Sequence, residues 1–214
     1  QCELCAVSLG EVETALQDWV GATRPKLVLL EPMSLADVAE DIAKTGMALA
    51  VEKQADRLNA DMAEGFAALR AVTSEVPRKT VFFMEWTAPL MGAGNWMPET
   101  IAAAGGEVVL GQEAVDSPIV SLDDIAAVDP DVILVGPCGF SIDRARQEMA
   151  VLQDEKGWQN LRAVKAGEVY LVNGKHFFNR PGPRLLQSAE IAAEILHPHN
   201  FAAANHGTGW VRHA

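Results

Sequence analysis

The sequence has no excess of positive charge and no apolar run long enough to span a membrane. It contains 17 Lys and Arg against 29 Asp and Glu, which gives a formal net charge of −12 and a pI near 4.8. Nucleic acids and anionic membrane surfaces attract basic faces, so this balance argues against both as partners. No apolar run approaches the roughly 20 residues of a membrane-spanning helix.

Motifs of the common enzyme classes are also missing. The sequence has no phosphate-binding P-loop, no Gly-x-Ser-x-Gly, and no Gly-x-Gly-x-x-Gly directly after a predicted strand. The segment 91–96, Met-Gly-Ala-Gly-Asn-Trp, has two glycines of such a loop but lacks the third. His176 has no Ser, Cys or acidic residue close by in the sequence to act as a catalytic partner. We therefore expect a protein that is not an enzyme and that has no catalytic residues.

The three cysteines, Cys2, Cys5 and Cys138, are too few for a disulfide framework. Cys2 and Cys5 have the Cys-x-x-Cys spacing of redox pairs and zinc sites. No second Cys-x-x-Cys and no His-x3-His follows at zinc-finger spacing. We favour buried or helix-terminal thiols and expect no bound metal, and a redox or metal-dependent protein is the alternative.

Strand and helix patterns alternate from Arg78 onward. Short apolar runs predict strands at 81–84, 107–110, 132–135 and 169–172. Helical patterns follow them at 98–104, from Ser121 to the residue before Asp129, at 142–152, and from Pro183. This alternation predicts an α/β fold: a Rossmann-like, three-layer lobe with a mainly parallel sheet, spanning residues 77–201.

Helical patterns dominate the segment that precedes this lobe. Ser34 and Asp37 form a capping box, and apolar residues then recur every three or four positions over 51–75. A helix of that length would run about 37 Å at 1.5 Å per residue. We interpret residues 33–76 as a helical linker with a strut between two lobes, and residues 202–214 as a flexible tail.

The first 32 residues offer one helix, opened by a capping box of Ser8 and Glu11, and one strand at Leu27–Leu30. A single strand cannot close a sheet, so residues 1–32 are interpreted as the remnant of a first lobe. The sequence begins at Gln1 without an initiator Met, and we expect that an upstream segment precedes it.

Three loops follow three of the predicted strands, at 85–96, 136–140 and 173–183. In a doubly wound sheet these loops meet at one edge, where open α/β sheets bind ligands. They would bring aromatic rings and amide or guanidinium donors to one rim, a combination that suits a broad, flat ligand with polar groups around it. The alternative is that the rings are ordinary core aromatics. The candidate ligand-binding residues are Trp86, Asn95, Trp96, Phe140, Phe178, Asn179 and Arg180.

Several motifs together resemble the cobalamin-binding branch of the class III ABC-transporter substrate-binding proteins, over residues 1 to about 201. They are Gln-Cys-Glu-Leu-Cys-Ala-Val-Ser8, Leu-Glu-Pro-Met-Ser-Leu-Ala-Asp37, Met-Glu-Trp86, Gly-Asn-Trp-Met-Pro-Glu99, Asp-Pro-Asp-Val-Ile-Leu-Val-Gly-Pro-Cys-Gly-Phe140 and Phe-Phe-Asn-Arg-Pro-Gly-Pro-Arg184. The resemblance implies two Rossmann-like lobes bridged by one long helix, with the ligand in the cleft between them. It departs from the family pattern because most of the first lobe is missing.

The resemblance also implies a function. The protein would carry cobalamin or a related corrinoid, without catalysis or a cofactor of its own, to an ABC permease from the periplasm or cell envelope. All the candidate residues except Asn95 would face the ligand, and Glu99 would dock onto the permease. Haem or a ferric siderophore is the alternative ligand, in which case Cys138 or His176 is a candidate metal contact. A lobe that acts only as an interaction module is a further alternative.

Overall fold

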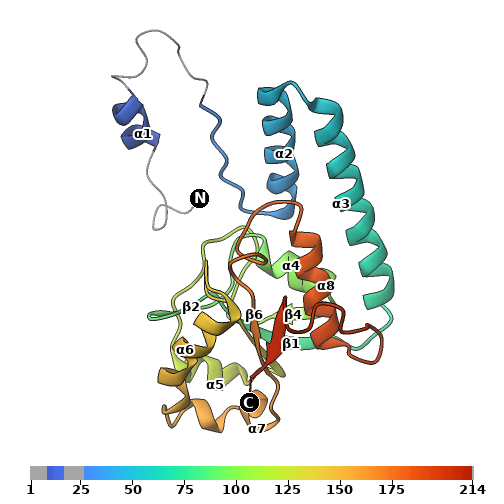
Figure 1. Ribbon diagram of the computed structural model, residues 1–214. Coiled ribbons are helices and arrows are strands. Elements are labelled where there is room, and N and C mark those ends of the chain that lie inside the picture. Colours follow the sequence, from blue (N-terminus) through green and yellow to red (C-terminus); the bar gives the residue numbers. More distant parts are fainter. Residues whose placement is uncertain (1–8, 17–26, 214) are drawn as a thin grey trace.

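The computed structural model of the protein describes residues 9–16 and 27–213. A five-stranded sheet lies at its centre (Figure 1). The strand order is β4-β1-β5-β6-β7, with the first four strands parallel and β7 antiparallel to β6. The strands are β1 (Lys79–Met84), β4 (Gly106–Val108), β5 (Val132–Val135), β6 (Val169–Val172) and β7 (Trp210–Arg212). The predicted, mainly parallel sheet is therefore confirmed.

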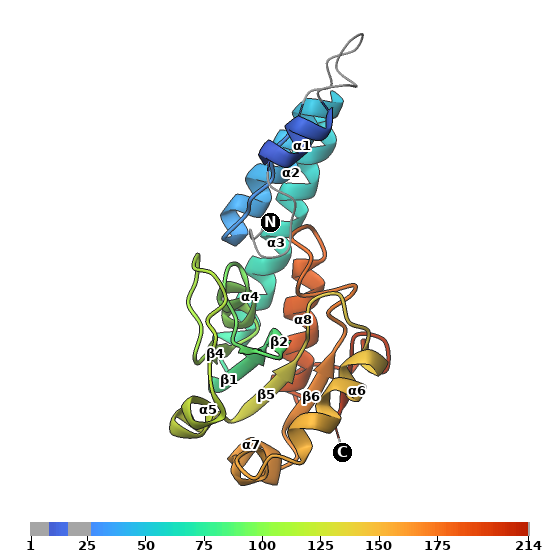
Figure 2. The same cartoon turned by 90° about the vertical axis from the view of Figure 1, so that its left-hand side faces the viewer.

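Helices cover both faces of the sheet (Figure 2). Alternate residues of β1 serve the two faces: Phe83 belongs to the core cluster on one side and Phe82 to the cluster on the other, and both are fully buried. A strand buried on both faces reads as a continuous apolar run, which is why these strands could be predicted. The first face holds α4 (Met97–Ala103) and α8 (Leu185–Leu196); the second holds α5 (Leu122–Val128), α6 (Ile142–Gln153), the 3-10 turn η1 (Trp158–Asn160) and α7 (Arg162–Lys165). This is the predicted three-layer α/β arrangement.

Two antiparallel helices, α2 (Leu35–Leu49) and α3 (Glu52–Thr73), project from the lobe (Figure 1). The predicted capping box of Ser34 and Asp37 is present at the start of α2. The 22 residues of α3 span about 33 Å at 1.5 Å per residue. Gly65 lies where α3 meets α8, and a Cβ atom there would come within 2.2 Å of Leu186 Cδ2. Glycine thus permits the close approach that anchors α3 to the lobe.

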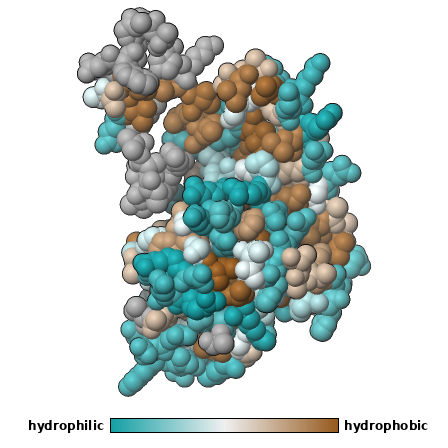
Figure 3. Space-filling view, viewed as in Figure 1, coloured by the Kyte–Doolittle hydropathy of each residue, from teal (hydrophilic) through white to brown (hydrophobic). Residues whose placement is uncertain are grey.

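Apolar side chains are exposed at the far end of this helical pair. Met47 and Leu49 near the end of α2 are 62% and 67% exposed. Figure 3 shows an apolar surface over this end of the molecule. Among the described residues, no helix combines the length and the apolarity that crossing a membrane requires.

The segment before α2 differs from the prediction. The structure describes α1 (Leu9–Leu16), whereas Cys2, Cys5 and the Ser8 of the first capping box lie outside the described residues. Leu27–Leu30 was predicted to be a strand, and this is wrong. These four residues are not in a strand, and their side chains are 38–48% exposed. A strand is defined by the ladder hydrogen bonds that it makes with a neighbouring strand, and Leu27–Leu30 belong to neither of the described sheets.

The tail at 202–214 was predicted to be flexible, whereas Trp210–Arg212 form β7 at the edge of the sheet. A buried carboxylate holds it in place. Glu194 on α8 accepts hydrogen bonds from the backbone N–H and the side-chain amide of Asn205 and from the indole N–H of Trp210. Because Glu194 is only 5% exposed, these donors replace the water that it would otherwise bind.

Candidate functional site at the carboxyl edge of the sheet

The loops that follow β1, β5 and β6 lie together at one edge, because these strands are neighbours in the sheet. Backbone hydrogen bonds join them. The N–H of Cys138 donates to the carbonyl oxygen of Glu85 over 3.3 Å, and the N–H of Lys175 donates to that of Phe140 over 2.8 Å. The three loops therefore form one connected surface.

Trp86 and Phe140 meet at this surface. Trp86 belongs to β2 (Trp86–Thr87), which pairs with β3 (Leu90–Met91) in a small hairpin within the predicted 85–96 loop. The Trp86 and Phe140 rings lie 5.2 Å apart at an interplanar angle of 55°, and both residues are half-buried. The Arg144 guanidinium lies over the Phe140 ring, 5.2 Å from the ring centroid. These three side chains, which we call the aromatic rim, combine two ring surfaces with a guanidinium that is also ion-paired with Glu148.

Trp96 and Phe178 are also connected, but through the backbone. The indole N–H of Trp96 donates to the carbonyl oxygen of Phe178 over 2.8 Å. The Phe178 ring is fully buried, 5.4 Å from the Phe83 ring, and its N–H donates to Ser188 Oγ on α8. The prediction that Phe178 faces a ligand does not fit this structure, because a fully buried ring has no surface to offer. Its positive φ of 59° turns the chain so that the ring enters the core. Trp86, Trp96 and Phe178 therefore do not form one rim.

The predicted polar residues have mainly structural contacts. Asn179 is buried, and its side-chain amide donates to the carbonyl oxygen of Gly136 over 2.7 Å, which ties the loop after β6 to the loop after β5. The exposed Arg180 directs its Nε–H to the Lys175 carbonyl oxygen over 3.3 Å. Asn95 has a positive φ of 53°. Within the described part of the chain, the side-chain oxygens of Asn95 and Asn179 are buried without a hydrogen-bond partner.

Sequence reasoning missed Glu85, which directly follows β1. Its side chain accepts hydrogen bonds from the Ser117 hydroxyl and from the Gly94 backbone, and burial raises the pKa of its carboxyl. A Cβ atom at Gly94 would lie 2.4 Å from the Val115 carbonyl oxygen, so the segment containing Ser117 packs tightly on the segment after β3. The available signal was the position of an acidic residue immediately after a buried strand.

Glu99, predicted to dock onto a permease, lies in the first turn of α4 and contacts the linker. Its Oε2 accepts a hydrogen bond of 2.7 Å from the N–H of Leu35, at the start of α2. Burial raises the pKa of the Glu99 carboxyl. The contact joins the lobe to the helical pair, and the docking role stays a prediction.

No group of three or more His, Cys, Asp or Glu among the described residues is arranged to hold a metal ion. Cys138 is exposed, and His176, also exposed, is positioned by its backbone N–H, which donates to Asn173 Oδ1 over 3.2 Å. Beside them, this edge carries the rings of Trp86 and Phe140 and the guanidinium groups of Arg144 and Arg180.

Comparison with known proteins identifies the family. Residues 15–175 match the model of the periplasmic binding proteins. The chain belongs to the periplasmic binding protein family. This match confirms the resemblance to class III substrate-binding proteins that the motifs indicated.

Individual members of the family are similar over most of the chain. A vitamin B12-binding protein of Salmonella choleraesuis (strain SC-B67) is 23% identical over 173 residues, covering 80% of this chain. The chain spans 60% of the length of that relative. An ABC transporter substrate-binding protein from Listeria monocytogenes EGD-e has a TM-score of 0.74 at 17% identity, covering 90% of this chain and 76% of its own. A periplasmic heme-binding protein from Pseudomonas aeruginosa has a TM-score of 0.72 at 19% identity, covering 91% and 70% respectively.

Proposed function

We propose that this periplasmic binding protein is a non-enzymatic carrier that holds cobalamin or a related corrinoid at the carboxyl edge of its sheet and delivers it to an ABC permease. The aromatic rim of Trp86, Phe140 and Arg144 is the observation that carries the proposal. The rings of Trp86 and Phe140 are 5.2 Å apart and half-buried, so part of their surface is open to a guest. Large, flat ligands bind to such surfaces through apolar contact and ring stacking.

The curated relative supports a corrinoid as the guest, because it is named as a vitamin B12-binding protein. The side chains at the carboxyl edge of the sheet also agree with a corrinoid as the ligand. A corrinoid holds its cobalt in its own ring nitrogens and needs a shaped surface rather than a cluster of protein ligands for a bare ion. The described residues offer two ring faces and a guanidinium group there.

Haem is the second candidate, because the solved structure from Pseudomonas aeruginosa is titled as a heme-binding protein. Haem is also flat and would use the same ring faces. It differs from cobalamin in carrying two carboxylates at one edge and an iron that commonly takes an axial protein ligand. The exposed His176 and Cys138 are the nearest candidates for that ligand.

Isothermal calorimetry of the chain with cyanocobalamin and with haemin tests the proposal. We expect saturable binding of cyanocobalamin and a weaker or absent response to haemin. Trp86→Ala and Phe140→Ala should each weaken the binding. Val72→Ala is the control, because it removes exposed apolar surface on α3, away from the edge. If neither compound binds, or if all three variants bind like the parent, the carrier assignment fails.

Delivery to a permease places the protein outside the cytoplasm, in the periplasm or cell envelope. An acidic residue on the lobe would pair with basic residues of the permease, and we propose Glu99 for this role. Its contact with Leu35 leaves the second carboxylate oxygen for such a pair. A pull-down with a reconstituted permease, comparing Glu99→Gln with the parent, tests this part separately.

A further inference from the structure

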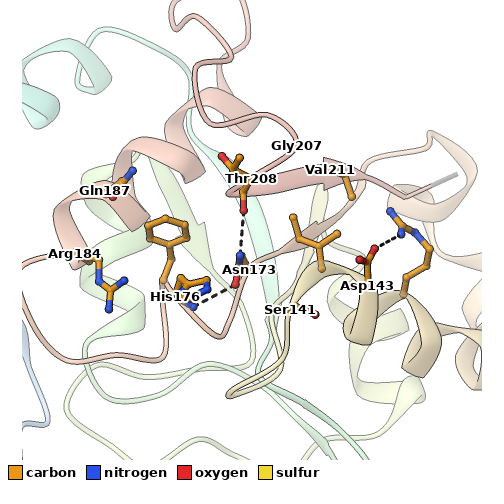
Figure 4. Close-up of a pocket in the computed structure, with 12 residues that line it drawn as sticks. Ser141, Asp143, Asn173, His176, Arg184, Gln187, Gly207, Thr208 and Val211 are labelled. Carbon is orange, nitrogen blue, oxygen red and sulfur yellow. Dashed lines mark hydrogen bonds and ion pairs between the residues drawn. The ribbon is translucent and has the colours of Figure 1, made fainter.

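A cavity of about 590 Å³ lies next to the aromatic rim, between the starts of α6 and α8 (Figure 4). Its walls come from the loop after β6, the first residues of both helices and the residues before β7. This volume falls within the usual range of small-molecule sites. Because the order of the strands is β1-β5-β6-β7, the cavity continues the same edge of the sheet beyond Phe140.

The cavity carries positive charge in a chain whose net charge is −12. Arg184 lines it, is exposed and makes no ion pair with any residue that the structure describes. Figure 4 shows the Arg184 guanidinium and the His176 ring at one end of the cavity and Asp143 at the other. Arg146 also lines it, and its guanidinium is neutralised by Asp143 at 2.8 Å. Arg184 is thus the cation available to a ligand.

Two helix starts border the same space. The cavity is lined by Ser141, the N-cap of α6, and by Arg184, the N-cap of α8. Both helices have 12 residues, and free N–H groups give a helix start a partial positive charge that favours anions. Ser141 caps α6 by accepting from the N–H of Arg144, whereas α8 has no side-chain cap. The first N–H groups of α8 are already used, because Leu185 donates to the Gly182 carbonyl oxygen over 3.0 Å and Leu186 to that of Pro183 over 3.4 Å. The positive end of the cavity is therefore the Arg184 guanidinium.

The wall that carries His176 is held in place by hydrogen bonds. Asn173 donates from its side-chain amide to the Thr208 carbonyl oxygen over 3.1 Å and accepts at Oδ1 from the His176 N–H. Ile142 and Val211 add apolar surface to the lining. The cavity therefore combines an apolar part with a cationic end, which suits an acidic side group attached to a larger molecule.

We propose that this cavity binds a carboxylate or phosphate group, with the Arg184 guanidinium as its main contact and His176 beside it. For the identity of the molecule that carries the group, the inference rests on the proposed function: the group is an acidic side group of the flat guest at the aromatic rim. Arg184 would then determine specificity, because it favours acidic guests over neutral ones of the same shape.

Inorganic phosphate tests the cavity without any assumption about the guest. In the parent chain, we expect phosphate to shift the His176 ring resonances in NMR spectra saturably. Arg184→Gln should weaken this response about tenfold or more, because charge-assisted hydrogen bonds are lost. Arg180→Gln is the matched control, since Arg180 is on the same loop but does not line the cavity. An unshifted His176, or an equal response in Arg184→Gln, would overturn the assignment.

Pairs of ligands that differ in their acidic groups test the link to the guest. Haemin is compared with its dimethyl ester, and cyanocobalamin with dicyanocobinamide, which lacks the phosphate-bearing nucleotide. The acidic member should bind more tightly to the parent and to Arg180→Gln, and this preference should disappear in Arg184→Gln. Equal affinities within both pairs would reject the link. If no ligand of either pair binds, the proposed function and the link fail together, and the phosphate titration still decides the cavity.

Discussion

Glu99 and Leu35 join the lobe to the helical pair through a hydrogen bond of 2.7 Å between the Glu99 carboxylate and the Leu35 N–H. The residues are 64 positions apart in the chain, so the bond exists only in the folded protein. It supplies an acceptor to one of the free N–H groups at the start of α2. Glu99→Ala should therefore reduce the free energy of unfolding by about 1 kcal/mol, as the loss of a helix cap does. Urea unfolding measures the change.

The same contact predicts a dependence on pH. Burial raises the pKa of the Glu99 carboxyl above its ordinary value of 4.5, so the folded protein binds this proton more tightly than the unfolded chain. The resulting stabilisation is complete below about pH 4.5 and is lost as the pH rises through the raised pKa. Glu99→Gln keeps an acceptor for Leu35 but does not titrate. Its stability relative to the parent should rise across that window, and a constant difference in urea unfolding would contradict the prediction.

Substitutions of Phe178 test whether its ring packs in the hydrophobic core or contacts the ligand. Because its ring is fully buried beside Phe83, Phe178→Ala should destabilise the protein by about 3–5 kcal/mol. Phe178→Leu fills more of the space and is the variant for binding experiments. Its affinity for cyanocobalamin, measured by calorimetry on the folded fraction, should equal that of the parent. A large loss of affinity with unchanged stability would show instead that the ring contacts the ligand.

The layers of the fold could be predicted because burial on both faces leaves a direct mark on the sequence. The strands at Val132–Val135 and Val169–Val172 were predicted residue for residue from continuous apolar runs. The helix start at Ser34 was predicted because the side chains of Ser34 and Asp37, three residues apart, each accept a hydrogen bond from the other's backbone N–H. Both signals are local, so a single sequence is enough to read them.

The site could be predicted only in part, because its details depend on distant contacts. Phe177 and Phe178 are adjacent and alike in sequence, yet only Phe178 is fully buried, held by Ser188 on the next helix and by its own positive φ. The cavity beside the aromatic rim combines residues from the starts of two helices and two other segments, so no single motif contains it. The position of the loops was predictable, whereas the direction of each side chain was not.

Trp210 tests the finding that the end of the chain is part of the sheet. Its indole N–H donates to the buried Glu194 carboxylate over 2.8 Å. Trp210→Phe keeps a ring against Tyr170 but removes this donor, and hydrogen bonds to charged groups contribute about 1.5–3 kcal/mol. We expect a loss of stability of that order in urea unfolding. Hydrogen exchange provides a second measurement, since the amides of β6 and β7 should lose protection together. Unchanged stability would mean that β7 contributes little to the fold.

The two tryptophans of the segment after β1 should respond in opposite ways to the same substitution. Trp96 donates to the Phe178 carbonyl oxygen from a partly buried position, so Trp96→Phe should cost about 0.5–1.5 kcal/mol of stability. Trp86 donates at 3.0 Å to Ala88 within an exposed hairpin, where water can replace the bond, so Trp86→Phe should cost less stability. Trp86→Phe should instead weaken cyanocobalamin binding, because it reduces the ring surface at the aromatic rim. Urea unfolding and calorimetry on both variants measure the two effects side by side. If Trp96→Phe lost affinity and Trp86→Phe did not, the ligand would lie on the Trp96 side of the edge, and the aromatic rim would not be its binding surface.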